Sequence, residues 1–177
     1  MTQGQARARL IVMRHAQAGA GGVRDHDRPL TPAGLDDAHR VGRRLAREGP
    51  IPDRILCSSA RRCRETGAAV IAGLGASPRV EHVDALYDAS VEGLLHAIAG
   101  VDESEVLMLI AHNPGVSLLT IELASAREAD RARVGGGFSP ATTACFDVEA
   151  DWSLISPRTV RLFRFERPPS PESASRD

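Results

Sequence analysis

Apolar residues along the chain follow two alternating patterns, short continuous runs and longer stretches with helical spacing. The continuous runs include several β-branched residues and predict buried strands at 10–13, 55–57 and 106–110, while a weakly alternating segment at 79–83 predicts another strand. Apolar residues at intervals of three or four positions predict helices that follow these runs at 32–48, 60–74, 91–99 and 116–124. Strands and helices therefore alternate over the first two thirds of the chain.

The first predicted helix has well-defined ends. Thr31 is suited to the N-cap position and Pro32 to the first helical position. Gly49 followed by Pro50 is typical of the residues that end a helix.

The last third of the chain is less regular. Segments 142–148 and 159–165 predict two strands of a hairpin or an edge pair, connected around Trp152. Residues 126–140 contain three consecutive glycines and predict a mobile loop.

Domain organisation follows from these patterns. We expect one domain over residues 9–166, with a flexible head at 1–8 and a tail at 167–177 that is disordered by composition. The alternation predicts an α/β fold, namely a three-layer α/β/α sandwich with a mixed, mostly parallel central sheet. Ligands of such sheets bind beyond the carboxyl ends of the strands. Three segments follow strand ends here: Arg14-His15, residues 58–62 and His112-Asn113.

Composition narrows the possible functions. The chain has 177 residues, 42% of them hydrophobic, which suits one globular domain. A net charge of −1 argues against a dedicated nucleic-acid partner. The apolar runs are too short to cross a membrane, and the first residues lack the features of a signal peptide. Three cysteines without a Cys-x-x-Cys motif favour free thiols in a reducing, cytoplasmic location.

All 22 basic residues are arginine, and the chain contains no lysine. Schiff-base chemistry, pyridoxal-phosphate attachment and a Walker A loop are therefore excluded. Any phosphate or carboxylate that this protein binds by charge must be held by arginine, histidine or backbone N–H groups.

The three strand-end segments combine two histidines with several arginines. Arginine binds phosphate through planar, bidentate hydrogen bonds, and a neutral imidazole can attack phosphorus. A single histidine near a strand end is more often structural. His15 and His112 at two strand ends make an anion site and a structural role about equally supported by position alone.

Four ordered motifs resemble the histidine phosphatase superfamily, which includes the phosphoglycerate mutases, and in particular its SixA-type phosphohistidine phosphatases. The resemblance covers roughly residues 9–166. The motifs are Leu10-Ile11-Val12-Met13-Arg14-His15-Ala16, Arg28-Pro29-Leu30-Thr31-Pro32-Ala33-Gly34, Ser58-Ser59-Ala60-Arg61-Arg62-Cys63-Arg64-Glu65-Thr66 and His112-Asn113-Pro114-Gly115.

The resemblance implies a role for each matching residue. His15 matches the nucleophile that becomes phosphorylated, Arg14 and Arg62 match the two arginines of the phosphate pocket, and His112 matches the second histidine. Ser58 and Thr66 frame Arg62 in the pattern Ser-x-x-x-Arg-x-x-x-Thr. By the same spacing, Arg61 and Arg64 lie outside the pocket.

Two further residues are candidates for substrate binding. Asn113 follows the second histidine directly. Arg28 either reaches the substrate or forms a structural ion pair with Asp25 or Asp27, and the sequence supports both interpretations equally.

Two positions depart from the family pattern. Ala16 replaces a glycine of the signature, which could crowd the backbone near the phosphate. Mutases and sugar phosphatases of the superfamily carry a glutamate proton donor after the third strand, but residues 84–90 contain none. Asp88 is the nearest candidate for that acid and for a substrate contact, although a turn carboxylate ahead of the next helix is the favoured interpretation.

Two other phosphatase chemistries are disfavoured. Asp25-His26-Asp27 with His15 has the residue types of a metal cluster or an Asp-x-Asp nucleophile, but it follows a glycine-rich loop and is better explained as a solvated polar loop. Cysteine phosphatases need an arginine six positions after the cysteine, and the residues at those positions are Cys63, Ala69 and Asp151. We therefore expect no metal and no cofactor.

These observations predict a phosphatase that forms a phosphohistidine intermediate. The first substrate hypothesis is phosphohistidine on a signalling protein. The alternatives are small phosphate esters, such as sugar or glycerate phosphates, and a module that binds phosphoproteins without turnover. The expected partners are accordingly a phosphohistidine-bearing protein or a small phosphorylated molecule, without nucleic acid or membrane.

Overall fold

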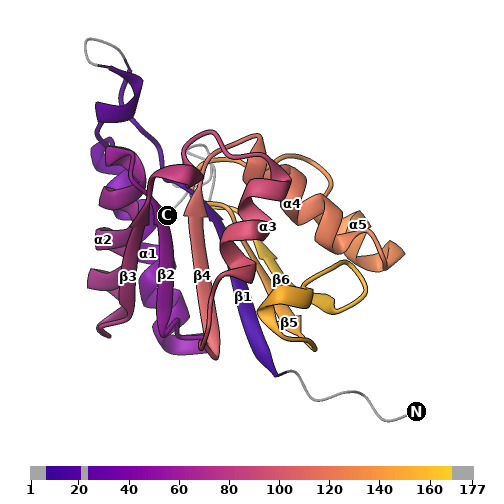
Figure 1. Cartoon of the computed structure of the whole chain (residues 1–177). Coiled ribbons are helices and arrows are strands. Elements are labelled where there is room, and N and C mark those ends of the chain that lie inside the picture. Colours follow the sequence, from indigo (N-terminus) through magenta and orange to yellow (C-terminus); the bar gives the residue numbers. More distant parts are fainter. Residues whose placement is uncertain (1–6, 21–23, 169–177) are drawn as a thin grey trace, which may run out of the picture.

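The computed structural model describes residues 7–20 and 24–168, which form one sheet covered by helices on both faces (Figure 1). The sheet has six strands in the order β3-β2-β4-β1-β5-β6. The strands are β1 (Ala8–Arg14), β2 (Arg54–Ser58), β3 (Arg79–Val83), β4 (Val106–Ala111), β5 (Thr143–Val148) and β6 (Val160–Glu166). Strands β1 to β4 pair in parallel, whereas β5 is antiparallel to both β1 and β6.

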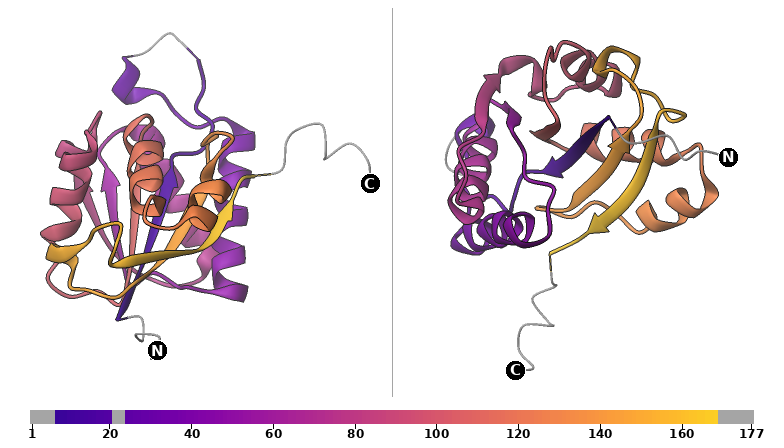
Figure 2. Two further views of the ribbon diagram at one scale, coloured as in Figure 1. Left: turned by 90° about the vertical axis from the view of Figure 1, so that its right-hand side faces the viewer. Right: turned by 90° about the horizontal axis from the view of Figure 1, so that it is seen from below.

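Five helices form the outer layers, α1 (Pro32–Glu48), α2 (Arg61–Leu74), α3 (Val91–Ala99), α4 (Gly115–Ala124) and α5 (Glu128–Val134). Helices α1 and α2 cover one face of the sheet, and α3, α4 and α5 cover the other (Figure 2). The expected three-layer α/β/α sandwich with a mixed, mostly parallel sheet is confirmed.

Alternating side chains of the central strands divide the core into two halves. Leu10 and Val12 of β1 pack beneath α3 and α4, whereas Ile11 and Met13 pack beneath α1 and α2. All four side chains are completely buried, as a strand with helices on both faces requires. The continuous apolar runs in the sequence therefore correspond to the centre of the sheet.

Helix α1 begins and ends where the sequence predicts. The Thr31 hydroxyl accepts a hydrogen bond from the Gly34 amide at 3.0 Å, and Gly49 has a positive φ of 65°. Within α1 and α2, Gly42 and Gly73 allow close approach, because a Cβ atom at either position would lie within 2.2 Å of the other helix's backbone. This contact fixes α2, whose first turn carries Arg62.

The predicted loop at 126–140 is partly wrong, because Glu128–Val134 forms helix α5. Val134 is the only apolar residue of this helix that is well buried, so its sequence has no apolar stripe from which a helix is predicted. Polar contacts with edge strand β6 hold α5 in place instead. The Asp130 carboxylate accepts from the Leu162 amide at 3.2 Å, and Arg133 donates to the carbonyls of Leu162 and Phe163.

Most of the expected head and tail lies outside the described residues, which begin at Arg7 and end at Pro168. Ala8 already belongs to β1, where the Arg7 amide donates to the Val148 carbonyl at 2.8 Å. Within the described ranges, no helix is long and apolar enough to span a lipid bilayer.

Candidate active site

The carboxyl ends of β1, β2 and β4 bring the three strand-end segments together. Arg14 lies opposite Ala111 in the β1–β4 register, and the His15 amide donates to the Ala111 carbonyl at 3.0 Å. The imidazole rings of His15 and His112 consequently have centroids 5.2 Å apart. Arg62 joins them from the first turn of α2. Four residues from three separate motifs therefore form one cluster.

His15 is held in one tautomer. Its Nδ1 lies 2.7 Å from the Ala16 carbonyl oxygen, which can only accept, so Nδ1 carries the proton and Nε2 keeps its lone pair. Burial, together with the positive charges of Arg62 and Arg14, lowers the pKa of His15 to about 4. The imidazole is therefore neutral and nucleophilic at pH 7.

His112 is neutral for similar reasons but has the opposite pattern of hydrogen bonds. Its Nδ1 accepts from the Arg62 guanidinium at 3.1 Å, so its Nε2 carries the proton and donates to the Ser58 hydroxyl at 2.8 Å. Burial and the Arg62 charge lower the pKa of His112 to about 3. Ser58 thus orients the second histidine.

Two arginines supply positive charge to the cluster. Arg62 is 5% exposed and donates through Nη1 and Nη2 to the carbonyl and carboxylate oxygens of Asp25, at 2.6 and 3.0 Å. Arg14 donates through Nη1 to the Phe138 carbonyl at 2.9 Å. The Arg14 Nε atom is buried without a hydrogen-bond partner among the described residues, and burial lowers the pKa of this guanidinium. Unused guanidinium donors in a buried pocket are suited to an anion.

Thr66 connects Ala16, the residue after His15, to the helix that carries Arg62. Its hydroxyl accepts a hydrogen bond from the Ala16 amide at 3.0 Å and donates to the Arg62 carbonyl at 2.6 Å. Thr66 is completely buried, so water cannot replace either contact.

We expect Thr66→Val to lower the free energy of unfolding by ~1–3 kcal/mol, because the buried Ala16 amide loses its acceptor. Urea denaturation measures this change. Thr120→Val is the matched control, since Thr120 is equally buried and also donates to the carbonyl one turn earlier, at 2.8 Å. Among the described residues, no amide donates to the Thr120 hydroxyl, so the control should cost less than ~1 kcal/mol. Equal losses in the two variants would contradict this role of Thr66.

The three candidate substrate-binding residues, Arg28, Asn113 and Asp88, lie in three different environments. Arg28 donates to the Asp25 carboxylate at 3.0 Å and to the Gly19 carbonyl at 2.8 Å, which corresponds to the ion-pair interpretation. Asn113 donates to the Phe138 carbonyl at 3.0 Å, and its buried Oδ1 has no protein partner within the described ranges. Asp88 is exposed in a turn with a φ of 52°.

Other residues that the sequence analysis singled out lie outside the cluster. Arg61 is exposed and pairs with Glu65 at 2.7 Å, and Arg64 is also exposed. The Ala16 side chain is completely buried within the core beneath α1 and α2. Among the described residues, no group of three or more His, Cys, Asp or Glu side chains is arranged to hold a metal ion.

Sequence reasoning missed two residues of the site, Asp25 and Tyr87. The Tyr87 hydroxyl donates to the Asp25 carboxylate at 2.7 Å. The Tyr87 ring meets His112 edge to face, with centroids 5.3 Å apart. The sequence suggests for Asp25 a solvated loop, a metal cluster, an Asp-x-Asp nucleophile or an ion pair with Arg28. It does not suggest a contact with Arg62, because no local pattern shows that the loop of Asp25 folds over that residue.

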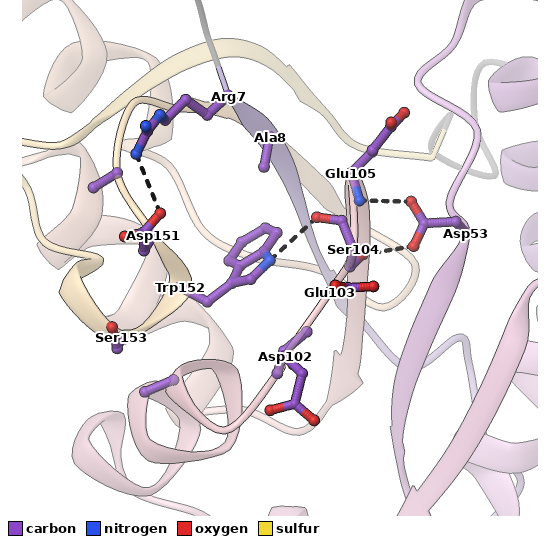
Figure 3. Close-up of a pocket in the computed structure, with 13 residues that line it drawn as sticks. Arg7, Ala8, Asp53, Asp102, Glu103, Ser104, Glu105, Asp151, Trp152 and Ser153 are labelled. Carbon is purple, nitrogen blue, oxygen red and sulfur yellow. Dashed lines mark hydrogen bonds and ion pairs between the residues drawn. The ribbon is translucent and has the colours of Figure 1, made fainter.

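Two hollows lie at opposite ends of the sheet. One of about 850 Å³ surrounds the amino ends of the strands, where Asp53 accepts hydrogen bonds from Ser104 and Glu105 and Trp152 donates to the Ser104 carbonyl (Figure 3). It contains none of the clustered histidines and arginines. A hollow of about 490 Å³ adjoins the cluster and is lined by Asp88, His112 and Asn113 among others. Of these two hollows, the smaller is the one that includes a residue of the cluster, His112.

Comparisons with known proteins find similar sequences and structures. The family model of the histidine phosphatase superfamily (branch 1) matches residues 10–97. An uncharacterized protein of Mycobacterium tuberculosis strain H37Rv is 33% identical over 161 residues, which are 88% of this chain and 99% of the relative.

Two solved structures are also similar along nearly the whole chain. A candidate phosphohistidine phosphatase SixA from Nakamurella multipartitia has a TM-score of 0.81 and 32% identity, and the match covers 91% of this chain and 96% of that one. A candidate phosphohistidine phosphatase SixA from Agrobacterium tumefaciens has a TM-score of 0.77 and 31% identity, with 91% and 98% covered.

Proposed function

Because the chain belongs to the histidine phosphatase superfamily, we propose that it is a phosphatase in which His15 carries the phosphoryl group during turnover. The observation that carries this proposal is the hydrogen bond from His15 Nδ1 to the Ala16 carbonyl. It leaves the Nε2 lone pair available in a pocket with two arginines. A nucleophile must be unprotonated, and the lowered pKa of His15 meets that requirement at pH 7.

The reaction has two steps. His15 Nε2 attacks phosphorus, the bond to the leaving group breaks, and the leaving group departs with the bonding electrons and takes a proton from water. Water then attacks phospho-His15, which releases inorganic phosphate and restores the neutral imidazole. Arg14 and Arg62 stabilise the charge on the non-bridging oxygens. When a phosphoryl oxygen replaces Arg62 at His112 Nδ1, its negative charge favours uptake of a proton from water at that nitrogen, and His112 then donates a hydrogen bond to the oxygen.

We propose phosphohistidine on a protein as the substrate. The two SixA-like structures, at 32% and 31% identity, support this assignment. The leaving group supports it independently. An alkoxide has a conjugate acid comparable to water, at ~15.7, and needs a proton donor. A phosphohistidine ring that is protonated on its other nitrogen leaves as neutral imidazole, whose conjugate acid lies near ~6.5, and needs less help. Residues 84–90 contain no glutamate, and the nearest carboxylate, Asp88, is exposed.

Small phosphate esters are the second candidate, because Asp88 lines the same hollow as His112. We expect kcat/KM to be highest for phosphohistidine peptides and activated aryl phosphates and lowest for sugar and glycerate phosphates. Asp88→Asn should change phosphohistidine turnover by less than about tenfold, below the ~10²–10⁴ expected of an essential general acid. Phosphate release from both substrate classes, measured in parallel, checks this order.

Asp84→Asn is the matched control, since Asp84 is an exposed carboxylate in the preceding turn. Suppose that a sugar or glycerate phosphate is turned over faster than any phosphohistidine substrate and that only Asp88→Asn shows a large defect. Asp88 would then be the general acid, and small esters would replace phosphohistidine as the proposed substrate class. Hydrolysis of a generic aryl phosphate would distinguish either phosphatase activity from a module that only binds phosphoproteins.

We also propose a cytoplasmic location. Cys57, Cys63 and Cys145 are all free and buried, which suits a reducing compartment.

A further inference from the structure

We propose that Asp25 is a positioning residue that holds the Arg62 guanidinium in the orientation needed to bind a phosphoryl group. The inference rests on the proposed function, since it assigns Arg62 to the phosphate pocket. It concerns a short turn, Asp25–Asp27, that lies between β1 and α1 in the sequence and contacts Arg62.

Asp25 contacts Arg62 at two points. The main-chain carbonyl accepts from Nη1 at 2.6 Å, and the carboxylate accepts from Nη2 at 3.0 Å. The remaining N–H of Nη2 is directed to His112 Nδ1, at 3.1 Å. Asp25 therefore holds the outer edge of the guanidinium and leaves the edge beside His112 to face the substrate. A bidentate contact fixes the plane of the guanidinium as well as its position.

Asp25 is itself held by two further donors. Arg28 donates to Oδ1 at 3.0 Å, and the Tyr87 hydroxyl donates to Oδ2 at 2.7 Å. These hydrogen bonds, led by that of Tyr87, keep the pKa of the Asp25 carboxyl well below its usual range, so it stays ionised. The Arg62 guanidinium also lies 5.8 Å from the Tyr87 ring centroid. Asp25, Arg28, Arg62 and Tyr87 form one network, which we call the Asp25 bridge.

The bridge contributes little to the hydrophobic core. No residue of the turn Asp25–Asp27 is buried, and the Asp25 side chain is 53% exposed. Its partner Arg62, in contrast, is almost completely buried and belongs to the catalytic cluster. A substitution at Asp25 should therefore affect anion binding and turnover more than unfolding.

A carboxylate close to an anion pocket has a second physical interpretation, in which it competes with phosphate for Arg62. The main-chain contact argues against competition, because phosphate could not displace the Asp25 carbonyl without moving the whole turn. The two interpretations predict opposite changes in phosphate affinity when the carboxylate is removed.

The test compares Asp25→Ala, Asp25→Asn and Tyr87→Phe with the wild type. Binding of inorganic phosphate and orthovanadate is measured by calorimetry, and kcat and KM are measured with an aryl phosphate. We expect Asp25→Ala to weaken phosphate binding by about 10- to 100-fold, the range for losing a hydrogen bond between charged groups. The kcat should fall by more than KM rises, because the arginine acts most strongly on the transition state.

The other variants separate positioning from stability. Asp25→Asn keeps one carboxamide oxygen for Arg62 and should recover part of the loss, and Tyr87→Phe should show a smaller loss in the same direction. Asp27→Asn is the matched control, because Asp27 lies in the same turn and pairs with Arg24 at 2.9 Å. The hydrogen bonds of the Arg62 guanidinium to described residues go to Asp25 and His112 instead. The phosphate affinity of Asp27→Asn should equal that of the wild type, and all four variants should retain the wild-type urea midpoint.

Tighter phosphate binding in Asp25→Ala would show that Asp25 competes with substrate and would overturn the proposal. Unchanged affinity, or a loss matched by Asp27→Asn, would overturn it as well. A wild-type protein that binds phosphate but hydrolyses no phosphorylated compound would refute the proposed function alone, while the calorimetry would still decide the role of Asp25.

Discussion

Replacing His15 with alanine should lower kcat/KM by ~10³-fold or more, on the scale seen when an enzyme loses its nucleophile. The variant lacks the Nε2 lone pair that the Ala16 contact leaves free, so it has no group to form the phosphorylated intermediate. Rapid acid-free quenching with labelled substrate should trap acid-labile phosphate on His15 of the wild type and none on the variant. His96→Ala is the control, because His96 is an exposed histidine on α3, away from the site.

The pH dependence should identify the same residue. Activity is lost when His15 becomes protonated, and burial lowers its pKa to about 4. After correction for the ionisation of the substrate, the acid limb of kcat/KM should therefore fall near pH 4 rather than near ~6.5, the value of an exposed histidine. Wild-type-like turnover in His15→Ala, or labelled phosphate at another residue, would refute the mechanism.

Arg62→Gln should lower kcat by ~10²–10³-fold, the effect of removing one preorganised donor from a developing negative charge. Arg62 is buried, and its charge is one cause of the lowered pKa of both His15 and His112. The substitution should accordingly raise both pKa values and move the acid limb of kcat/KM to higher pH. Steady-state kinetics across the pH range measures the two effects together.

Arg61→Gln is the control for this prediction. Arg61 is the adjacent arginine on α2, but it is exposed and pairs with Glu65. Its kcat should stay within about twofold of the wild type, since exposed ion pairs contribute little. Comparable losses in the two variants would show that the first turn of α2 acts through its total charge rather than through the Arg62 geometry.

Local sequence patterns determined most of the fold. The apolar runs at 10–13 and 106–110 are the two central strands, because only strands covered on both faces lack polar positions. Thr31 and Gly49 mark the ends of α1 through local effects. The Thr31 hydroxyl accepts a hydrogen bond from the Gly34 amide, and Gly49 adopts a positive φ that favours glycine. The parallel arrangement then placed Arg14, His15, Arg62 and His112 at one edge of the sheet, where the structure brings them together.

Other features depend on contacts between segments distant in sequence, which no local pattern encodes. Helix α5 has a single well-buried apolar side chain and is held by polar contacts with β6. The Asp25 bridge joins residues 25 and 62 with Tyr87, and Arg14 is bound by the Phe138 carbonyl 124 positions away. The tautomer of His112 also follows from such contacts, with Arg62 and Ser58. Sequence thus determined that Arg14, His15, Arg62 and His112 lie near one another. Tertiary packing decided how Arg62 and His112 are oriented and brought Asp25 and Tyr87 to the site, because a hydrogen bond depends on the relative positions of atoms rather than on spacing along the chain.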